Sequence, residues 1–93
     1  MLLKKKILKA IENFNEIRVP EAKAELIEFK DKKFLVKFSG YMCYTCGVYD
    51  YFEDLVIELE NLGVKSKIEE YKRFNDYFLV EYQMSQKENL SLK

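Results

Sequence analysis

The stretch FKDKKFLVKF, residues 29–38, decides the fold because it holds a turn and the strand that follows it. Asp31 and Lys32 are expected to form the tight turn, since Asp is a common turn residue. After the turn, every second residue is apolar, which is the period of a strand with one buried face. These apolar residues are Phe34, Val36 and Phe38. Gly40 is expected to end the strand.

The strand before this turn is expected over residues 23–29, and its apolar positions change phase. The apolar residues stand at even-numbered positions as far as Leu26. From Ile27 to Phe29 they stand at odd-numbered positions. A change of phase indicates a β-bulge, in which one strand carries an extra residue. The pattern therefore predicts a bulged strand with Ile27 and Phe29 on one face.

A similar run, YKRFNDYFLVEY, occupies residues 71–82 and predicts a second hairpin. Its turn is expected at residues 73–76, between two alternating strands. The alternating apolar residues are Val64 and Ile68 before the turn, and Phe78, Val80, Tyr82 and Met84 after it. The likeness of the two hairpins raises the hypothesis of an internal repeat. Convergence of two aromatic-rich hairpins is the alternative.

Each hairpin follows a segment whose apolar residues recur at helical spacing. The first segment is expected to end near Asn15 or Glu16, before the extended connection that Pro20 imposes. The second is expected to be capped by Thr45 or Asp50 and stopped by Gly63. The apolar stripes are Leu3, Ile7, Ala10, Ile11 and Phe14 in the first, and Val48, Phe52, Leu55, Val56, Leu59 and Leu62 in the second.

The element order α-β-β-α-β-β predicts an α+β domain over residues 1–84, followed by a frayed polar tail over residues 85–93. Two αββ units suit a four-stranded antiparallel sheet with both helices on one face. This order is a circular permutation of the ferredoxin-like order βαββαβ. The open face would show Leu35, Leu79 and tyrosines among charged residues, a surface suited to a partner, a nucleic acid or a second subunit.

Cys43 and Cys46 lie in GYMCYTCGVYD, residues 40–50, between an expected strand and an expected helix. Over this segment the chain resembles the redox site of thioredoxin-like domains, where a helix start stabilises a thiolate. The resemblance implies a reversible disulfide. The remaining chain departs from that family, because no helix lies between its last two strands and no proline follows Pro20.

Two other interpretations of the cysteine pair remain open. The pair supplies half of a zinc site, so a closed site needs the same two cysteines from a second subunit. Alternatively, the two reduced thiols pack as small hydrophobes. The nearest charges in sequence, Asp50, Glu53 and Asp54, disfavour a thiolate and weigh against redox chemistry.

The same region is rich in tyrosine, at Tyr41, Tyr44, Tyr49 and Tyr51. Tyrosine is enriched at the centres of protein interfaces, so these residues are candidates for contact with a protein partner. They also suit base stacking, but their acidic neighbours make nucleic acid an unfavourable ligand. Lysines cluster over residues 4–9 and acidic residues over 50–60, which indicates two solvated helix faces. The alternative is that the basic helix meets the acidic one, within one chain or across a dimer.

The composition narrows the class of protein. The 93 residues suffice for one domain, and 16 basic residues balance 16 acidic ones, which argues against a general polyanion binder. There is no His and no Trp, so the usual general base is absent. The sequence shows no signal peptide or membrane span, and a cytoplasmic location with reduced thiols is expected. The Lys- and Glu-rich, Gln-poor composition resembles that of thermophile proteins.

These observations favour a non-enzymatic binding or interaction module that self-associates. The first alternative is a thiol–disulfide or shared zinc function at Cys43 and Cys46. The second is nucleic-acid binding on the open sheet face.

Overall fold

The computed structural model describes residues 2–44 and 47–84, and it contains the expected order of elements. Two αββ units follow one another, separated by a short 3-10 helix (η1). The bounds are α1 Leu2–Arg18, β1 Lys23–Lys30, β2 Lys33–Ser39, η1 Tyr41–Tyr44, α2 Val48–Asn61, β3 Ser66–Arg73 and β4 Tyr77–Met84. The tail predicted over residues 85–93 lies outside the described residues.

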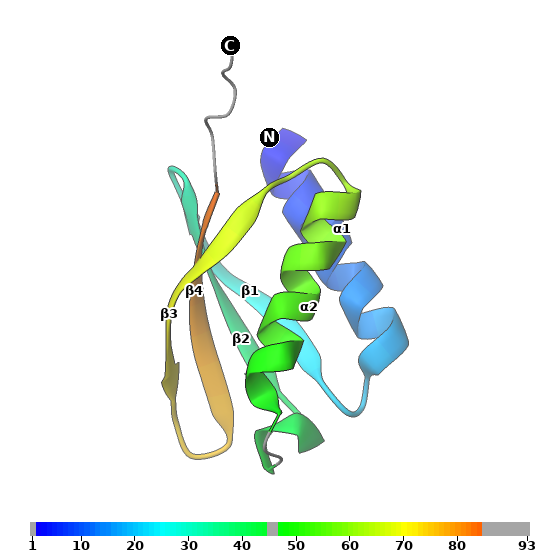
Figure 1. The fold of residues 1–93 in the computed structure, drawn as a ribbon, viewed down its shortest axis with the longest axis vertical. Helices are drawn as coiled ribbons and strands as arrows, with labels where there is room; N and C mark the ends of the chain where they lie inside the picture. Colours follow the sequence, from blue (N-terminus) through cyan, green and yellow to red (C-terminus); the bar gives the residue numbers. More distant parts are fainter. Residues whose placement is uncertain (1, 45–46, 85–93) are drawn as a thin grey trace.

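The four strands form one antiparallel sheet in the order β1-β2-β4-β3, and both helices cover the same face (Figure 1). This confirms the predicted α+β fold. The strand order is the one that a circular permutation of the ferredoxin-like fold produces. β1 and β3 are the edge strands, so each leaves one row of backbone groups without a strand partner in the sheet.

The likeness of the two αββ units is clearest in their central strands. Phe34-Leu35-Val36 in β2 recurs as Phe78-Leu79-Val80 in β4. The two strands pair with Val36 opposite Val80, so the repeated tripeptides are related by a local two-fold axis at this pair. Both edge strands also carry an irregularity, between Leu26 and Glu28 in β1 and between Ile68 and Glu70 in β3. The irregularity in β3 lies two residues further from the hairpin turn than the repeat of the central strands would place it.

The bulge in β1 is confirmed, but the predicted face of Ile27 is wrong. Ile27 is the extra residue and is 49% exposed, whereas Leu26 and Phe29 pack against the core. A bulge shifts the alternation that follows it by one residue, so Leu26 before the bulge and Phe29 after it share the buried face. The sequence pattern showed that the phase changed without showing which residue was left out.

The helix boundaries also differ from the expectation. α1 continues to Arg18, beyond the predicted end, because Asn15 faces the sheet instead of stopping the helix. The Asn15 amide nitrogen donates to the Ala24 oxygen at 2.9 Å, and the Ala24 N–H donates to the Asn15 amide oxygen at 2.7 Å. Asn15 therefore joins α1 to the start of β1.

At the start of α2, Gly47 is the N-cap, and no side chain caps it. Asp50 lies within the first turn of the helix, so the prediction that it caps the helix is wrong. Thr45 lies outside the described residues. Gly63 does end the helix, with a φ of 87° and an N–H that donates to the Glu60 oxygen at 2.9 Å.

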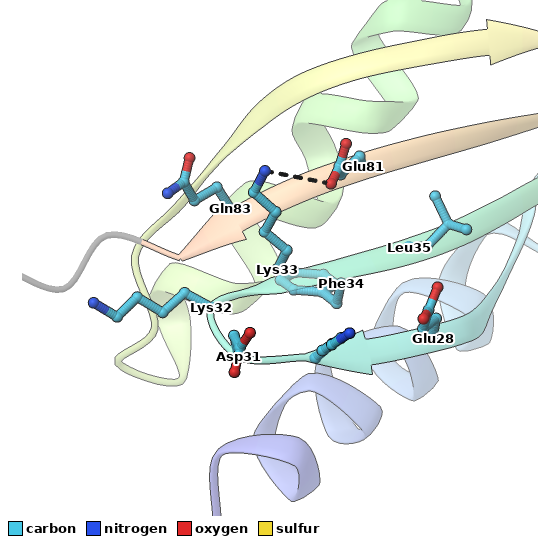
Figure 2. A pocket seen from close by; sticks show the side chains of 9 residues that line it. Glu28, Asp31, Lys32, Lys33, Phe34, Leu35, Glu81 and Gln83 are labelled. Atoms are coloured by element: carbon cyan, nitrogen blue, oxygen red, sulfur yellow. Dashed lines mark ion pairs between the residues drawn. The ribbon is translucent and has the colours of Figure 1, made fainter.

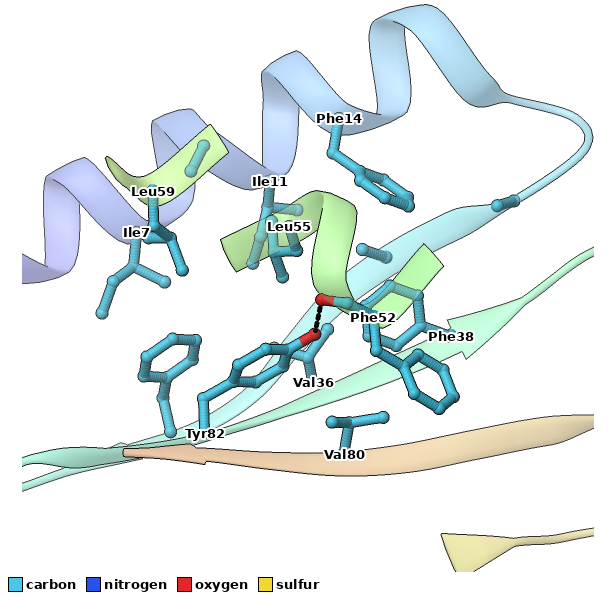
Figure 3. Packing of buried hydrophobic residues seen from close by; sticks show 14 of the residues in the cluster. Ile7, Ile11, Phe14, Val36, Phe38, Phe52, Leu55, Leu59, Val80 and Tyr82 are labelled. Atoms are coloured by element: carbon cyan, nitrogen blue, oxygen red, sulfur yellow. Dashed lines mark hydrogen bonds between the residues drawn. The ribbon is translucent and has the colours of Figure 1, made fainter. Parts of the chain in front are cut away.

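One hydrophobic core fills the space between the helices and the sheet (Figure 3). Its buried members come from both helices, from η1 and from β1, β2 and β4, and none is charged. Strand β3 contributes Ile68, which is partly buried and packs against the core. Tyr82 is fully buried in this core, and its hydroxyl donates to the Phe52 oxygen of α2 at 2.9 Å. Its ring stacks on Phe34, with 5.0 Å between ring centroids. The hydroxyl thus ties the central strand β4 to the middle of α2.

Asn15→Ala is expected to lower the free energy of unfolding by about 1–3 kcal/mol, because both polar backbone atoms of Ala24 lose their side-chain partner. Urea unfolding measures this loss. Glu16→Ala is the control, since Glu16 is an exposed neighbour on the same helix. Equal losses in the two variants would contradict the bridging role of Asn15.

Tyr82 is expected to make the fold sensitive to alkaline pH. Burial raises its pKa well above the ordinary value near 10, so the folded state keeps its proton longer than the unfolded state. The contribution of protonated Tyr82 to the free energy of unfolding is therefore complete below pH ~10 and is lost as the pH rises further. Above this pH, the free energy of unfolding of the Tyr82→Phe variant should fall less steeply than that of the protein with Tyr82.

The measurement is urea unfolding between pH 8 and 11. It is made in a Cys43→Ala background, because burial also raises the pKa of the Cys43 thiol. Parallel pH profiles with and without Tyr82 would show that its ionisation does not matter.

Candidate functional site

Cys43 is positioned by a close contact between two backbone segments. Gly40 ends β2 with a φ of 113°, and a Cβ at this position would lie 2.8 Å from the Glu21 oxygen. Only glycine allows this approach without strain. The Met42 N–H then donates to the same Glu21 oxygen at 2.8 Å, which holds η1 against the connection between α1 and β1. Cys43 consequently points inward.

The Cys43 side chain is 1% exposed, and its sulfur lies 3.8 Å from the Phe38 oxygen, to which the thiol donates. Burial raises the pKa of this thiol, and Asp76 raises it further, while Arg73 lowers it. The net direction is upward, so the protonated thiol is the form that this site favours. Nucleophilic and metal-binding cysteines act as thiolates, and the environment of Cys43 disfavours that state.

The geometry therefore fits Cys43 as a packing residue of the core. Cys46, its partner in the motif, lies outside the described residues. Within residues 2–44 and 47–84, no group of three or more His, Cys, Asp or Glu residues could hold a metal ion. The redox and shared zinc interpretations, which also involve Cys46, stay predictions.

The predicted tyrosine cluster is divided by the helix. Tyr49 and Tyr51 are two positions apart in α2, a spacing that puts side chains on different sides of a helix. Tyr49 faces Tyr71 of β3, whereas the Tyr51 hydroxyl donates to the Glu21 carboxylate. Tyr41 is 67% exposed in η1, and nothing is described of the Tyr44 side chain. Tyr49 and Tyr51 therefore do not form a single surface.

Tyr51 belongs to a polar contact between α2 and the C-terminal end of α1 with the connection that follows it. The hydrogen bond to Glu21 is the main cause that raises the pKa of Tyr51, followed by burial. Nearby, Arg18 of α1 lies 3.4 Å from Asp54 and 3.7 Å from Glu58, both on α2. The two helices therefore meet within the chain through Arg18, and not, in the residues that the structure describes, through the lysine cluster on which the hypothesis was based.

Arg18, which the sequence analysis did not single out, makes this helix contact. Among the described residues, no ion pair joins a lysine of residues 4–9 to α2; the pair that Lys9 forms is with Glu12, on its own helix. The guanidinium of Arg18 also lies 4.6 Å from the centre of the Phe14 ring.

Tyr49 contributes to an aromatic cluster between α2 and the edge strand β3. Its ring lies 5.8 Å from Tyr71 and 6.0 Å from Phe52, and Phe52 lies 5.2 Å from Tyr71. Phe52 is buried, whereas Tyr49 is 42% exposed and Tyr71 is 48% exposed. The cluster therefore begins in the core and ends in an aromatic surface at the β3 edge.

Arg73, at the end of β3, supports this edge. Its guanidinium donates to the Cys43 oxygen at 3.0 Å and lies 5.2 Å from the centre of the Phe78 ring. Tyr71 and Arg73 were absent from the predicted site residues. The available signal was the likeness of the two hairpins, which aligns Tyr71 with Phe29 and marks it as an aromatic residue of an edge strand.

A groove runs beside this surface, between α2 and β3. Its lining combines Tyr49 and Ile57 of α2 with Ser66 and Ile68 of β3. Ile57 is 53% exposed. The exposed apolar area of this groove continues the aromatic cluster along the same strand.

The open face of the sheet offers a different kind of surface (Figure 2). A depression near the turn between β1 and β2 is lined by three lysines and three acidic residues, with Phe34, Leu35 and Gln83. The charged residues are Glu28, Lys30, Asp31, Lys32, Lys33 and Glu81. Lys33 and Glu81 form an ion pair at 3.7 Å. The balance of charge gives this depression no preference for an anionic or a cationic ligand.

Comparison with known proteins yields a shared fold and no family. No family model matches the sequence, and neither does any curated protein. The crystal structure of the periplasmic domain of XcpY matches with a TM-score of 0.60 and 16% identity, covering 91% of this chain and 97% of that chain. A structure from the H-NOX family, studied for heme distortion, matches with a TM-score of 0.50 and 12% identity.

The H-NOX match covers 98% of this chain and 50% of that chain. At these identities, both matches show the architecture alone. In the described residues, no helix is long and apolar enough to cross a membrane.

Cys43 is expected to react with a thiol reagent such as DTNB about a hundredfold more slowly in the folded protein than in urea, because reaction requires local opening. The measurement uses Cys46→Ser, so that Cys43 is the only thiol. Cys43→Ser is the matched control and reports Cys46 alone. A folded-state rate equal to the rate in urea would contradict the buried position and favour a reactive thiol.

Proposed function

We propose that this protein is a non-enzymatic interaction module that associates with a second copy of itself. The observation that carries the proposal is the aromatic and apolar surface at the β3 edge, where Tyr49, Ile57 and Tyr71 are all more than 40% exposed. Aromatic residues are typical of the centres of protein interfaces. Their contact with the buried Phe52 holds this surface in a defined shape.

The chemistry of the remaining surface supports a binding role over catalysis. Cys43 is buried, which raises the pKa of its thiol, and the depression on the open face carries charges of both signs. Nucleic-acid binding on that face would require an excess of basic residues, and the lining supplies equal numbers of each sign. A protein surface with its own apolar centre is the more favourable partner.

We also propose a cytoplasmic location, with Cys43 reduced as a consequence. The similar domain of XcpY is periplasmic, but the likeness concerns the fold and carries no location. The proposed interaction does not depend on a disulfide, so it applies in either compartment.

Sedimentation velocity is expected to show a monomer–dimer equilibrium whose dimer fraction rises as the concentration increases from about 1 to 500 µM. Exposed aromatic surface of this kind commonly marks association sites. Tyr71→Ser should shift the equilibrium toward the monomer, and Tyr41→Ser, a change at an exposed tyrosine outside this surface, is the control. A monomer throughout the range would overturn the proposal.

A further inference from the structure

The direction of the backbone groups in β3 follows from its turn. The Phe74 N–H donates to the Tyr77 oxygen at 2.8 Å, so Phe74 and Tyr77 form a hydrogen-bonded pair. Hydrogen-bonded and non-hydrogen-bonded pairs alternate along an antiparallel ladder. Given the register of Arg73 with Phe78 and Tyr71 with Val80, the backbone groups of Arg73 and Tyr71 point away from β4. They face the open edge.

The side chains of this edge are self-complementary. Residues 69–73 read Glu-Glu-Tyr-Lys-Arg, with two acidic residues before the tyrosine and two basic residues after it. When such a segment pairs antiparallel with a copy of itself about Tyr71, Glu70 of each copy lies opposite Lys72 of the other. Opposite charges at such positions stabilise a sheet, and like charges destabilise it.

We infer that two copies of the chain associate by pairing β3 with β3 in antiparallel orientation, with Tyr71 on the two-fold axis. This inference rests on the proposed self-association and specifies its interface. In this register Tyr71 pairs with Tyr71, which requires outward backbone groups at that residue, as the turn geometry provides. The pairing extends the sheet of one copy into the sheet of the other and covers both β3 edges.

The two faces of the joined sheet then receive different contacts. Tyr71 contacts Phe52 and therefore lies on the helix face, where it meets the Tyr71 of the other copy. Glu70 and Lys72 alternate with it and lie on the open face, where both are exposed. Each interface thus contains two Glu70–Lys72 pairs beneath one aromatic centre. Arg73 is already held by the Cys43 oxygen and is not needed for the charge pattern.

The other edge strand, β1, is the natural comparison because the two αββ units repeat. The segment that sequence likeness aligns with Glu70-Tyr71-Lys72 is Glu28-Phe29-Lys30, which also carries an acid before and a base after an aromatic residue. Phe29 is partly buried against the core, however, whereas Tyr71 is 48% exposed. If β1 paired with a second β1 about Phe29, Ile27 of each copy would lie opposite Asp31 of the other, which is an unfavourable pairing of an apolar and a charged residue. These differences favour β3.

Charge exchange tests the inference directly. Glu70→Lys and Lys72→Glu each place like charges opposite one another twice in the dimer, and each is expected to raise the dimer dissociation constant about tenfold or more. The double variant Glu70→Lys/Lys72→Glu restores opposite charges and should recover the original dissociation constant. An equimolar mixture of the two single variants should form a heterodimer of similar affinity. Sedimentation velocity measures all four.

Glu28→Lys and Lys30→Glu are the matched controls at the aligned positions of β1, and they should leave the dissociation constant unchanged. Loss of association in these controls, with no effect at β3, would overturn the inference while the proposed self-association stands. A dimer that none of the variants weakens would overturn it as well and place the interface elsewhere. A wild-type monomer at every concentration would overturn both proposals.

Discussion

The pairing of β2 with β4 is the interaction on which the rest of the structure depends. Each αββ unit contributes one hairpin, and an isolated two-stranded hairpin is marginal in water. Placing Val36 opposite Val80 joins the hairpins into a four-stranded sheet and aligns the two Phe-Leu-Val segments. Both helices then lie on one face and share one core, which includes the central aromatic residues Phe34, Phe38, Phe78 and Tyr82.

The same pairing leaves β1 and β3 as edges, and the two edges differ in their side chains. Native proteins protect edge strands with charges and bulges, and both devices occur here: each edge strand has a bulge and alternating charged residues. β3 differs because an exposed tyrosine lies between an acidic and a basic segment. Charges in that order protect the edge against many partners, yet they are complementary to a second copy of the same strand.

Much of the fold could be predicted because hairpins and amphipathic helices have strong periodic patterns. The contacts that decide the candidate site depend on residues distant in sequence. The face of Ile27 depended on which residue the bulge left unpaired, and Gly47 became the cap of α2 where Asp50 was expected. The burial of Cys43 required the contact of Gly40 with Glu21, which no local spacing reveals. Tyr49 and Tyr51 are close in sequence, but their spacing in α2 puts them on different sides of the helix.

The cysteine motif and the β3 edge lead to opposite conclusions about where function lies. A Cys-x-x-Cys between a strand and a helix indicates redox chemistry only if the thiol is accessible as a thiolate, and Cys43 is buried with a raised pKa. Its backbone oxygen instead accepts from Arg73, the last residue of β3. The segment that resembled a reactive site therefore contacts the end of the edge strand and helps to position Arg73 there.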